Sequence, residues 1–412
     1  MSAHPTDIVR PLGAVEEFLW LFDHSSPKHF CLIAEVTGHT TVSDWRAALD
    51  ALQERHPMLS VSIDTTYNRV PHFRNVTGQP IPLRVAEGNT TWEREVEREM
   101  RTLFDPTKAP LIRAVLILQP EQAIVILVTH HSIADGMSSV FLLRDLLAAL
   151  SGQPLAPYPF PRSLDEIVGA PVRTSAEPGV AFSQDLAKKC VESPVHVKSK
   201  VLSQELTSQL KERARQEGTT VHGIVCAAVT VAGREIDQQW RESPLRIFSP
   251  VDIRGLIGVE DQCMDAFSKA VSVVETNSSA NLWDLARSIR STLLPFKTVE
   301  GNGPVISAIS GAMATNMDVE QGAEFNRAAF SEETMISNVG LVPYSPDFGK
   351  VMVKSLWAPA MLRGHEPEQT IGVATVNGSI HLIHTSWNPI PGLLEGIEQK
   401  LAEACLHVEV EE

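Results

Sequence analysis

The sequence predicts an α+β protein built from two halves. Strand and helix patterns mix irregularly along the chain, and 412 residues exceed what one hydrophobic core usually supports. A proline-rich stretch at residues 152–182 separates two such mixtures. We therefore expect an N-terminal subdomain at 1–160, a connection at 161–190 and a C-terminal subdomain at 191–412.

The N-terminal half carries strands and amphipathic helices in mixed order. A helix is predicted over residues 42–55, because Trp45, Leu49 and Leu52 fall on one face. Two more helices are expected, over 92–103 and over 137–150, the second of which stops before Gly152. The strands expected in this half are 30–37, 58–64, 71–76, 111–118 and 123–129, the last two forming a hairpin.

The C-terminal half repeats the mixture. The helices expected there are 204–216, 220–235, 282–294 and 391–407, and the expected strands include 246–254 and 270–276. Asn377-Gly378 is the strongest hairpin signal in the chain, because both residues tolerate the positive φ of a type I′ turn.

Composition excludes several classes of protein. A net charge of −15 makes nucleic acid an improbable partner, and no stretch approaches the 18 apolar residues of a transmembrane helix. The five cysteines are odd in number and widely spaced. This spacing favours a reducing, cytoplasmic environment over a disulfide framework or a zinc site, and we expect no metal site. The chain also lacks the G-x-S-x-G elbow of a serine hydrolase.

One segment carries most of the chemical information. The apolar run Ala123–Val128, typical of a strand buried on both faces, leads into His130-His131-Ser132-Ile133-Ala134-Asp135-Gly136. A strand end presents an imidazole rigidly, and histidine is suited to base catalysis near neutral pH. A single histidine in this place would more often be a packed core residue. The combined pattern, followed by a predicted helix, favours chemistry.

His130-His131-x-x-x-Asp135-Gly136 resembles the HHxxxDG signature of the chloramphenicol acetyltransferase-like superfamily, which includes the condensation domains of nonribosomal peptide synthetases. Further segments resemble family motifs along nearly the whole chain: Arg10-Pro11-Leu12, Arg55-His56-Pro57, Phe104-Asp105-Pro106, Pro250–Arg254 and Ser337–Gly340. The likeness is greatest to the stand-alone polyketide-associated acyltransferases. It implies two chloramphenicol acetyltransferase-like subdomains that form a pseudo-dimer with an interdomain channel.

The resemblance assigns roles to the two histidines and to the aspartate. By its place in the motif, His131 is the candidate general base, whereas His130 should point to the opposite face of the strand and be structural. Asp135 invites a triad interpretation, in which its carboxylate orients the imidazole. The family pattern instead implies that Asp135 pairs with Arg254 and braces the loop that carries His131.

Two more residues complete the predicted site. Gly136 is expected to permit a backbone conformation or a close approach closed to other residues, and its amide could stabilise an oxyanion. Asn338 is either a polar contact in the substrate channel or a turn residue at a strand end.

The function that this resemblance implies is acyl transfer from a coenzyme A or carrier-protein thioester to a hydroxyl-bearing small molecule, giving an ester in lipid or secondary metabolism. A thioester is already activated, so no cofactor beyond the substrates is expected. Two alternatives stay open: an amide-forming condensation enzyme, and a noncatalytic module that recruits an acyl carrier protein.

Overall fold

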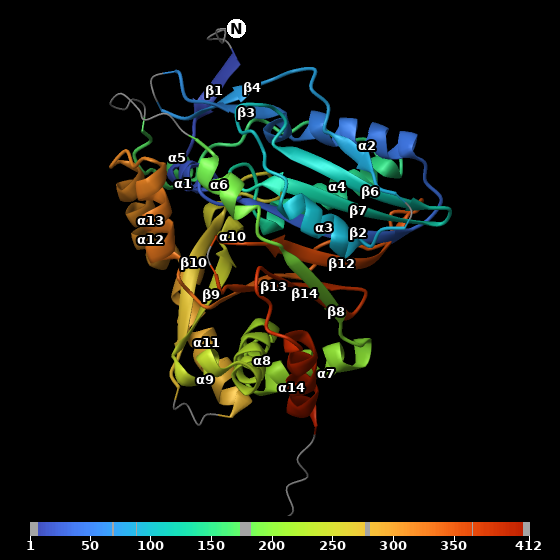
Figure 1. Ribbon diagram of the computed structural model, residues 1–412. Coiled ribbons are helices and arrows are strands. Elements are labelled where there is room, and N and C mark those ends of the chain that lie inside the picture. The colour runs from blue at the N-terminus through green and yellow to red at the C-terminus, as the bar shows by residue number, and fades with distance from the viewer. Residues whose placement is uncertain are drawn as a thin grey trace, which may run out of the picture.

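The computed structural model describes residues 7–67, 70–87, 89–173, 183–276, 281–364 and 366–406. Within these ranges it contains sheets of five, six and three strands, with helices packed around them (Figure 1). Strands and helices alternate irregularly in both halves, which confirms the predicted α+β class.

The five-stranded sheet carries the signature and runs in the order β12-β2-β7-β6-β5. Its strands are β2 (His29–Thr37), β5 (Leu83–Val85), β6 (Ile112–Gln119), β7 (Gln122–His130) and β12 (Met352–Met361). The predicted hairpin is present as β6 and β7, and β7 pairs with β2 along its whole length. The three helices packed near it are α2 (Val42–Arg55), α3 (Trp92–Met100) and α4 (Gly136–Leu150). Strand β7 is therefore central and buried, and the signature begins at its end.

The six-stranded sheet belongs to the C-terminal half and runs in the order β10-β9-β11-β13-β14-β8. Its strands are β8 (His196–Val201), β9 (Leu245–Asp252), β10 (Phe267–Val274), β11 (Thr334–Leu341), β13 (Gln369–Val376) and β14 (Ser379–Ser386). The predicted hairpin turn lies between β13 and β14, with φ of 49° at Asn377 and 75° at Gly378. Helices below this sheet in Figure 1 are α7 (Gln204–Gln216), α8 (Val221–Ile236), α9 (Gln238–Glu242), α11 (Leu282–Leu293) and α14 (Leu393–Cys405).

The two halves interlock through β12. This strand comes from the C-terminal part of the chain but pairs antiparallel with β2, from Met352 opposite Thr37 to Met361 opposite Phe30. The sequential division at residues 160 and 191 therefore does not separate the two sheets in space. The physical reason is that β2 would otherwise form an exposed sheet edge, which β12 covers.

The remaining elements lie at the top, on the left and near the middle of Figure 1, outside the two larger sheets. They are β1 (Ile8–Pro11), β3 (Val61–Asp64), β4 (His72–Asn75), α1 (Ala14–Asp23), α5 (Leu164–Val168), α6 (Asp185–Cys190), α10 (Arg254–Ile257), α12 (Val299–Met313) and α13 (Val319–Ala329), with 3-10 turns at Pro57–Ser60 and Pro295–Lys297. Helices α5 and α6 lie in the predicted connection, of which residues 174–182 are outside the described ranges. The sequence did not predict α1, α12 or α13, although α1 packs against both of the others.

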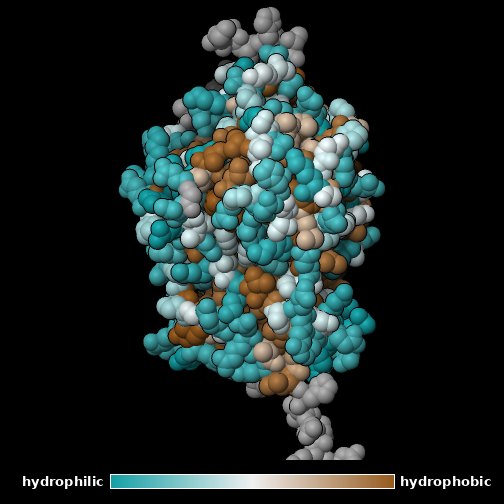
Figure 2. All heavy atoms as spheres, turned by 90° about the vertical axis from the view of Figure 1, so that its right-hand side faces the viewer, coloured by the Kyte–Doolittle hydropathy of each residue, from teal (hydrophilic) through white to brown (hydrophobic). Residues whose placement is uncertain are grey.

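The surface is that of a charged globular protein. On the face drawn in Figure 2, hydrophilic residues dominate and hydrophobic ones gather in separate patches. None of the described helices is both long enough and apolar enough to cross a membrane. The five cysteines are free thiols, and Cys31, Cys226 and Cys263 are buried.

Candidate active site

A cavity of about 600 Å³ lies between elements of the two halves. Its walls come from α1, α12, α13, the strands β9 to β12 and the first turn of α4. Apolar side chains dominate these walls and include the aromatic rings of Phe18, Phe22, Phe248, Phe267, Phe325 and Phe330. Cavities of this size and apolar character are typical of small-molecule binding sites.

His131 lies on the wall of this cavity, one residue after β7 ends. Its backbone N–H donates to the carbonyl of Lys28 at 2.7 Å, which continues the pairing of β7 with β2. The rings of Phe30 and Phe267 flank the imidazole, with centroid distances of 5.1 and 5.4 Å. The residue is 7% exposed, so its ring is held in place from several sides.

A carboxylate that the sequence analysis missed contacts this imidazole. Nδ1 of His131 lies 3.1 Å from Oδ1 of Asp265, a buried residue just before β10. Burial disfavours the imidazolium, but the hydrogen bond and charge of Asp265 outweigh it, and the pKa of His131 is raised. Burial also raises the pKa of Asp265 to about 6, against the opposing influence of His131. The only signal in the sequence is one acidic residue within the apolar stretch Cys263–Phe267.

His130 points away from the cavity and is completely buried. Its Nδ1 accepts a hydrogen bond from the backbone N–H of Ser132 at 3.2 Å, and Nε2 lies 3.4 Å from Oδ2 of Asp23. Burial disfavours the carboxylate of Asp23, yet the charge and hydrogen bonding of His130 help to hold its pKa below the ordinary range. The two adjacent histidines thus face different surroundings, as the alternation of side chains along a strand predicts.

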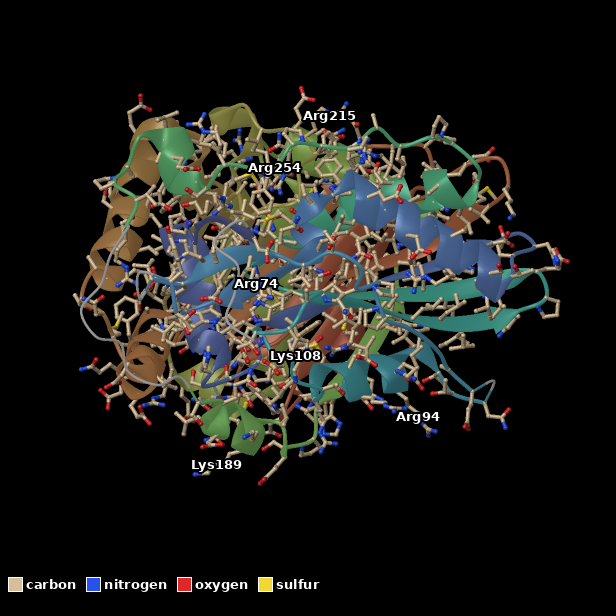
Figure 3. The ribbon with its side chains drawn as sticks, turned by 90° about the horizontal axis from the view of Figure 1, so that it is seen from above. Arg74, Arg94, Lys108, Lys189, Arg215 and Arg254 are labelled. Atoms are coloured by element: carbon tan, nitrogen blue, oxygen red, sulfur yellow. The ribbon has the colours of Figure 1, made fainter. Side chains whose placement is uncertain are left out.

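Asp135 and Arg254 form the expected ion pair, with Oδ2 of Asp135 2.6 Å from Nη1 of Arg254. Asp135 also caps α4, because its Oδ1 accepts from the backbone N–H of Ser138 at 2.8 Å. Burial disfavours its charge, but the guanidinium and these donors outweigh it and lower the pKa of Asp135. In Figure 3, Arg254 lies within the outline of the molecule, whereas Arg94 and Arg215 lie nearer its periphery. Asp135 therefore does not orient the imidazole in a triad.

The structure corrects the expectation for Gly136. This residue does not adopt a left-handed backbone, and a Cβ built on it would lie 3.5 Å from Cγ1 of Val339, an ordinary contact. No fold constraint therefore requires glycine here, although Gly136 does line the cavity. Asn338 lines the cavity from within β11, beside a shift in the pairing register with β13, and its Oδ1 accepts from the backbone N–H of Gly340 at 2.8 Å. It is therefore not a turn residue at the end of the strand.

Within the described residues, no group of three or more His, Cys, Asp and Glu side chains is arranged to hold a metal ion. Asn338 and the first turn of α4 contribute polar groups to the same cavity wall as His131, and Asp265 contacts the imidazole at Nδ1. This arrangement can accept a proton from a molecule in the cavity through Nε2, since Nδ1 is already engaged by Asp265.

Two family models match the parts of the chain that form this site. Residues 18–162 match the family model of the condensation domain, and residues 192–371 match that of the phthiocerol/phthiodiolone dimycocerosyl transferase C-terminus. The chain belongs to the condensation-domain superfamily. The two models together span the signature, the ion pair and most of the cavity wall.

Solved structures confirm the fold of this condensation-superfamily chain. Polyketide synthase associated protein 5 from Mycobacterium tuberculosis is 17% identical, with a TM-score of 0.67 over 97% of this chain and 98% of that one. The trichothecene 15-O-acetyltransferase TRI3 from Fusarium sporotrichioides is 12% identical, with a TM-score of 0.69 over 98% and 96%. These likenesses confirm the predicted pseudo-dimer of two chloramphenicol acetyltransferase-like subdomains.

Curated relatives match about a third of the chain. A probable non-canonical nonribosomal peptide synthetase from Salinispora arenicola is 28% identical over 161 residues, which cover 35% of this chain and 2% of that protein. Surfactin synthase subunit 2 from Bacillus subtilis is 30% identical over 119 residues, covering 29% and 3%. The chain thus spans only a few per cent of the length of these relatives.

Proposed function

We propose that this condensation-superfamily protein transfers an acyl group from a coenzyme A or carrier-protein thioester to a hydroxyl acceptor, with His131 as the general base. The observation that carries the proposal is the placement of His131 on the wall of an apolar cavity, with Nδ1 bonded to a buried carboxylate. This leaves Nε2 as the ring nitrogen available to a bound substrate.

The proposed step moves one proton twice. As the acceptor oxygen attacks the thioester carbonyl, its O–H proton passes to Nε2 of His131. The tetrahedral intermediate then collapses to an ester, the C–S bond breaks, and the departing thiolate takes the proton from the imidazolium. The N–H of Gly136, in the first turn of α4, is the candidate donor to the oxyanion, because the first N–H groups of a helix lack intrahelical partners.

The cavity supports a substrate with a large apolar group. Its walls are mostly aromatic and aliphatic, and its volume of about 600 Å³ lies within the range of small-molecule sites. The apolar walls would also limit the access of bulk water to the thioester. No cofactor beyond the substrates is needed for the proposed reaction, because a thioester is already activated.

A hydroxyl acceptor is favoured over an amine by the match of residues 192–371 to a model named for a transferase of phthiocerol and phthiodiolone. The amide-forming alternative is supported by the likeness of about a third of this chain to a probable nonribosomal peptide synthetase. A noncatalytic recruiting module, the third candidate, would have no use for an imidazole held by a carboxylate on a cavity wall.

Thiol release from saturated acyl-coenzyme A thioesters of two to sixteen carbons tests the proposal. The donors are incubated with 1-octanol or with octylamine, and products are identified by mass spectrometry. We expect octanol-dependent thiol release and an octyl ester, both lost in His131→Ala. Octyl amide alone would replace ester formation by amide formation. Turnover that survives His131→Ala would overturn the role of this residue.

A further inference from the structure

Asp265 is placed to control His131 from the other half of the chain. It is 2% exposed, and its Oδ1 lies 3.1 Å from Nδ1 of His131. Among the described residues, no group donates a hydrogen bond to its second oxygen, Oδ2. The imidazole is therefore the hydrogen-bonding partner on which this buried carboxylate depends.

Two other buried His–Asp pairs in the described chain show how unusual this arrangement is. They are His56–Asp145, at 2.8 Å, and His130–Asp23, at 3.4 Å. Their carboxylates have further donors, for example Arg144 Nε on Asp145 at 2.7 Å and the Lys28 N–H on Asp23 at 2.8 Å. Neither of their histidines lines the cavity. Of these three pairs, only His131–Asp265 has a carboxylate oxygen without a donor, and only this pair presents its imidazole to the cavity.

The loop that carries Asp265 is fixed on both sides by the signature aspartate and its partners. The backbone N–H of Ala266 donates to Oδ2 of Asp135 at 2.9 Å. On the other side, the carbonyl of Met264 accepts from Nη2 of Arg254 at 2.8 Å and from the hydroxyl of Ser138 at 2.8 Å. The network that braces His131 thus also positions Asp265.

We propose that Asp265 is a positioning residue that holds the proton of His131 on Nδ1 and makes Nε2 the basic nitrogen. This inference rests on the proposed function, in which Nε2 accepts the proton of the acceptor. A carboxylate can only accept here, so the neutral imidazole must place its proton on Nδ1. The negative charge also stabilises the imidazolium formed during the reaction.

Other charged groups around the pair each have a polar or charged partner of their own. Asp135 is paired with Arg254 at 2.6 Å, and Glu16 of α1 is paired with Arg10 at 2.7 Å. On the cavity walls, Lys269 is 2.6 Å from Glu332, Arg363 is 3.0 Å from Glu332, and Lys28 donates to the carbonyl of Arg363 at 2.7 Å. Asp252 lies 3.7 Å from Arg254. Asp265 is therefore the charge that acts most directly on His131, in agreement with the raised pKa of this histidine.

Nuclear magnetic resonance tests this without a substrate. The protein is labelled with 13C and 15N in its 14 histidines, and the His131 signals are identified as those missing from His131→Gln. In the wild type we expect neutral His131 to carry its proton on Nδ1. In Asp265→Asn, the imidazole pKa should fall by about one unit or more, because the partner charge is lost. Asp145→Asn makes the same change in the His56–Asp145 pair and should leave the pKa of His131 unchanged.

Kinetics with the acyl-coenzyme A donors and 1-octanol supply the second measurement. Asp265→Asn should lower kcat at least about tenfold with little change in KM, and should move the acidic limb of kcat/KM to lower pH. A proton on Nε2 in the neutral wild type would overturn the proposal. An unshifted His131 titration in folded Asp265→Asn would do the same. If His131→Ala loses turnover but Asp265→Asn keeps the wild-type kcat, the role of Asp265 is rejected and the proposed function stands. If His131→Ala keeps its turnover, the proposed function itself is rejected.

Discussion

Asp135 accepts a hydrogen bond from the backbone N–H of Ala266, 131 residues further along the chain, at 2.9 Å. Through this contact the signature aspartate binds the loop of the C-terminal half that delivers Asp265 to His131. The same carboxylate caps α4, directly after the loop that carries His131. One buried side chain thus fixes both members of the His131–Asp265 pair, which explains how Asp135 can serve the site without contacting the imidazole.

Replacement of Asp135 by alanine should lower the free energy of unfolding by about 3–5 kcal/mol, because Arg254 would keep a buried and unpaired charge. Denaturant titration measures this loss. Asp252→Asn is the matched control, since Asp252 is farther from Arg254, at 3.7 Å, and half exposed. It should cost less than about 1 kcal/mol. Equal losses in the two variants would contradict the bracing role of Asp135.

Alanine variants of the two adjacent histidines should lose different properties: activity at position 131 and stability at position 130. His131→Ala should lose at least about a hundredfold in turnover and remain folded. Because Asp265 loses its hydrogen-bonding partner in this variant, the melts are compared at pH 5, where a carboxyl with a pKa of about 6 is mostly protonated and leaves little buried charge. His130→Ala should be destabilised by a few kcal/mol, because Asp23 loses a partner inside the core. Thiol-release assays and thermal melts of both variants test this contrast. The reverse pattern would exchange the roles of the histidines.

Ionised Asp265 should make the folded protein less stable above about pH 6 than at pH 4. Burial raises the pKa of this carboxyl to about 6, so the native state binds a proton more tightly than the unfolded state. Stability therefore falls as pH rises from about 4 to about 6 and stays lower above that. Asp265→Asn removes the buried charge and should gain on the order of 1–2 kcal/mol at pH 8.

At pH 8, Asp145→Asn should lower the free energy of unfolding, whereas Asp265→Asn should raise it. Burial disfavours the carboxylate of Asp145, but hydrogen bonds from His56 and Arg144 outweigh this and lower its pKa to about 2. Its charge thus stabilises the fold above pH 4, and the asparagine variant should be less stable at pH 8. Chemical denaturation of both variants at pH 4 and pH 8 gives the comparison. A loss of stability in Asp265→Asn at pH 8 would contradict the assignment of a poorly solvated charge.

Acyl transfer should be direct, without an acyl-enzyme. The thiols of Cys31, Cys226 and Cys263 are buried, and burial raises the pKa of each. Burial also raises the pKa of Cys190 and Cys405. A thiol in this state is a poor nucleophile at neutral pH. Intact-protein mass spectrometry after incubation with donor alone should show no adduct, and steady-state kinetics should be sequential. An adduct that the acceptor removes would indicate a ping-pong mechanism.

The cavity should set the size of the transferred or accepting group. Ser337→Phe places a ring on a buried cavity wall, so kcat/KM for 1-octanol and long acyl donors should fall more than for ethanol and acetyl-coenzyme A. Leu341→Phe is the control on the same strand, because Leu341 is 65% exposed and outside the cavity. Equal losses for short and long substrates in Ser337→Phe would mean that the cavity does not hold their apolar parts.

Local patterns in the sequence determined the elements that need no distant partner. The helix at 42–55 and the helix at 204–216 match α2 and α7 in both bounds. The turn at Asn377-Gly378 also follows from its own residues. The apolar run before the signature was enough to predict a buried strand, because its burial on both faces leaves no alternation of polar residues. The candidate base, the opposite orientation of its neighbour and the Asp135–Arg254 contact came from the signature and the family resemblance.

Only the tertiary structure decided what surrounds His131, the proposed base. Helix α12 contains Gly301, Gly303 and Pro304, which disfavour a helix locally, so packing must override propensity there. Strand β12 joins the N-terminal sheet because it covers the edge of β2. The residues of either strand alone do not indicate this pairing. Asp265 is 134 residues from His131 in the sequence, where nothing distinguishes it from other single acidic residues. Only the folded chain places it, buried, beside the imidazole. Periodicity reports how a segment meets its immediate surroundings, whereas a site assembled across two halves depends on contacts that only the folded chain makes.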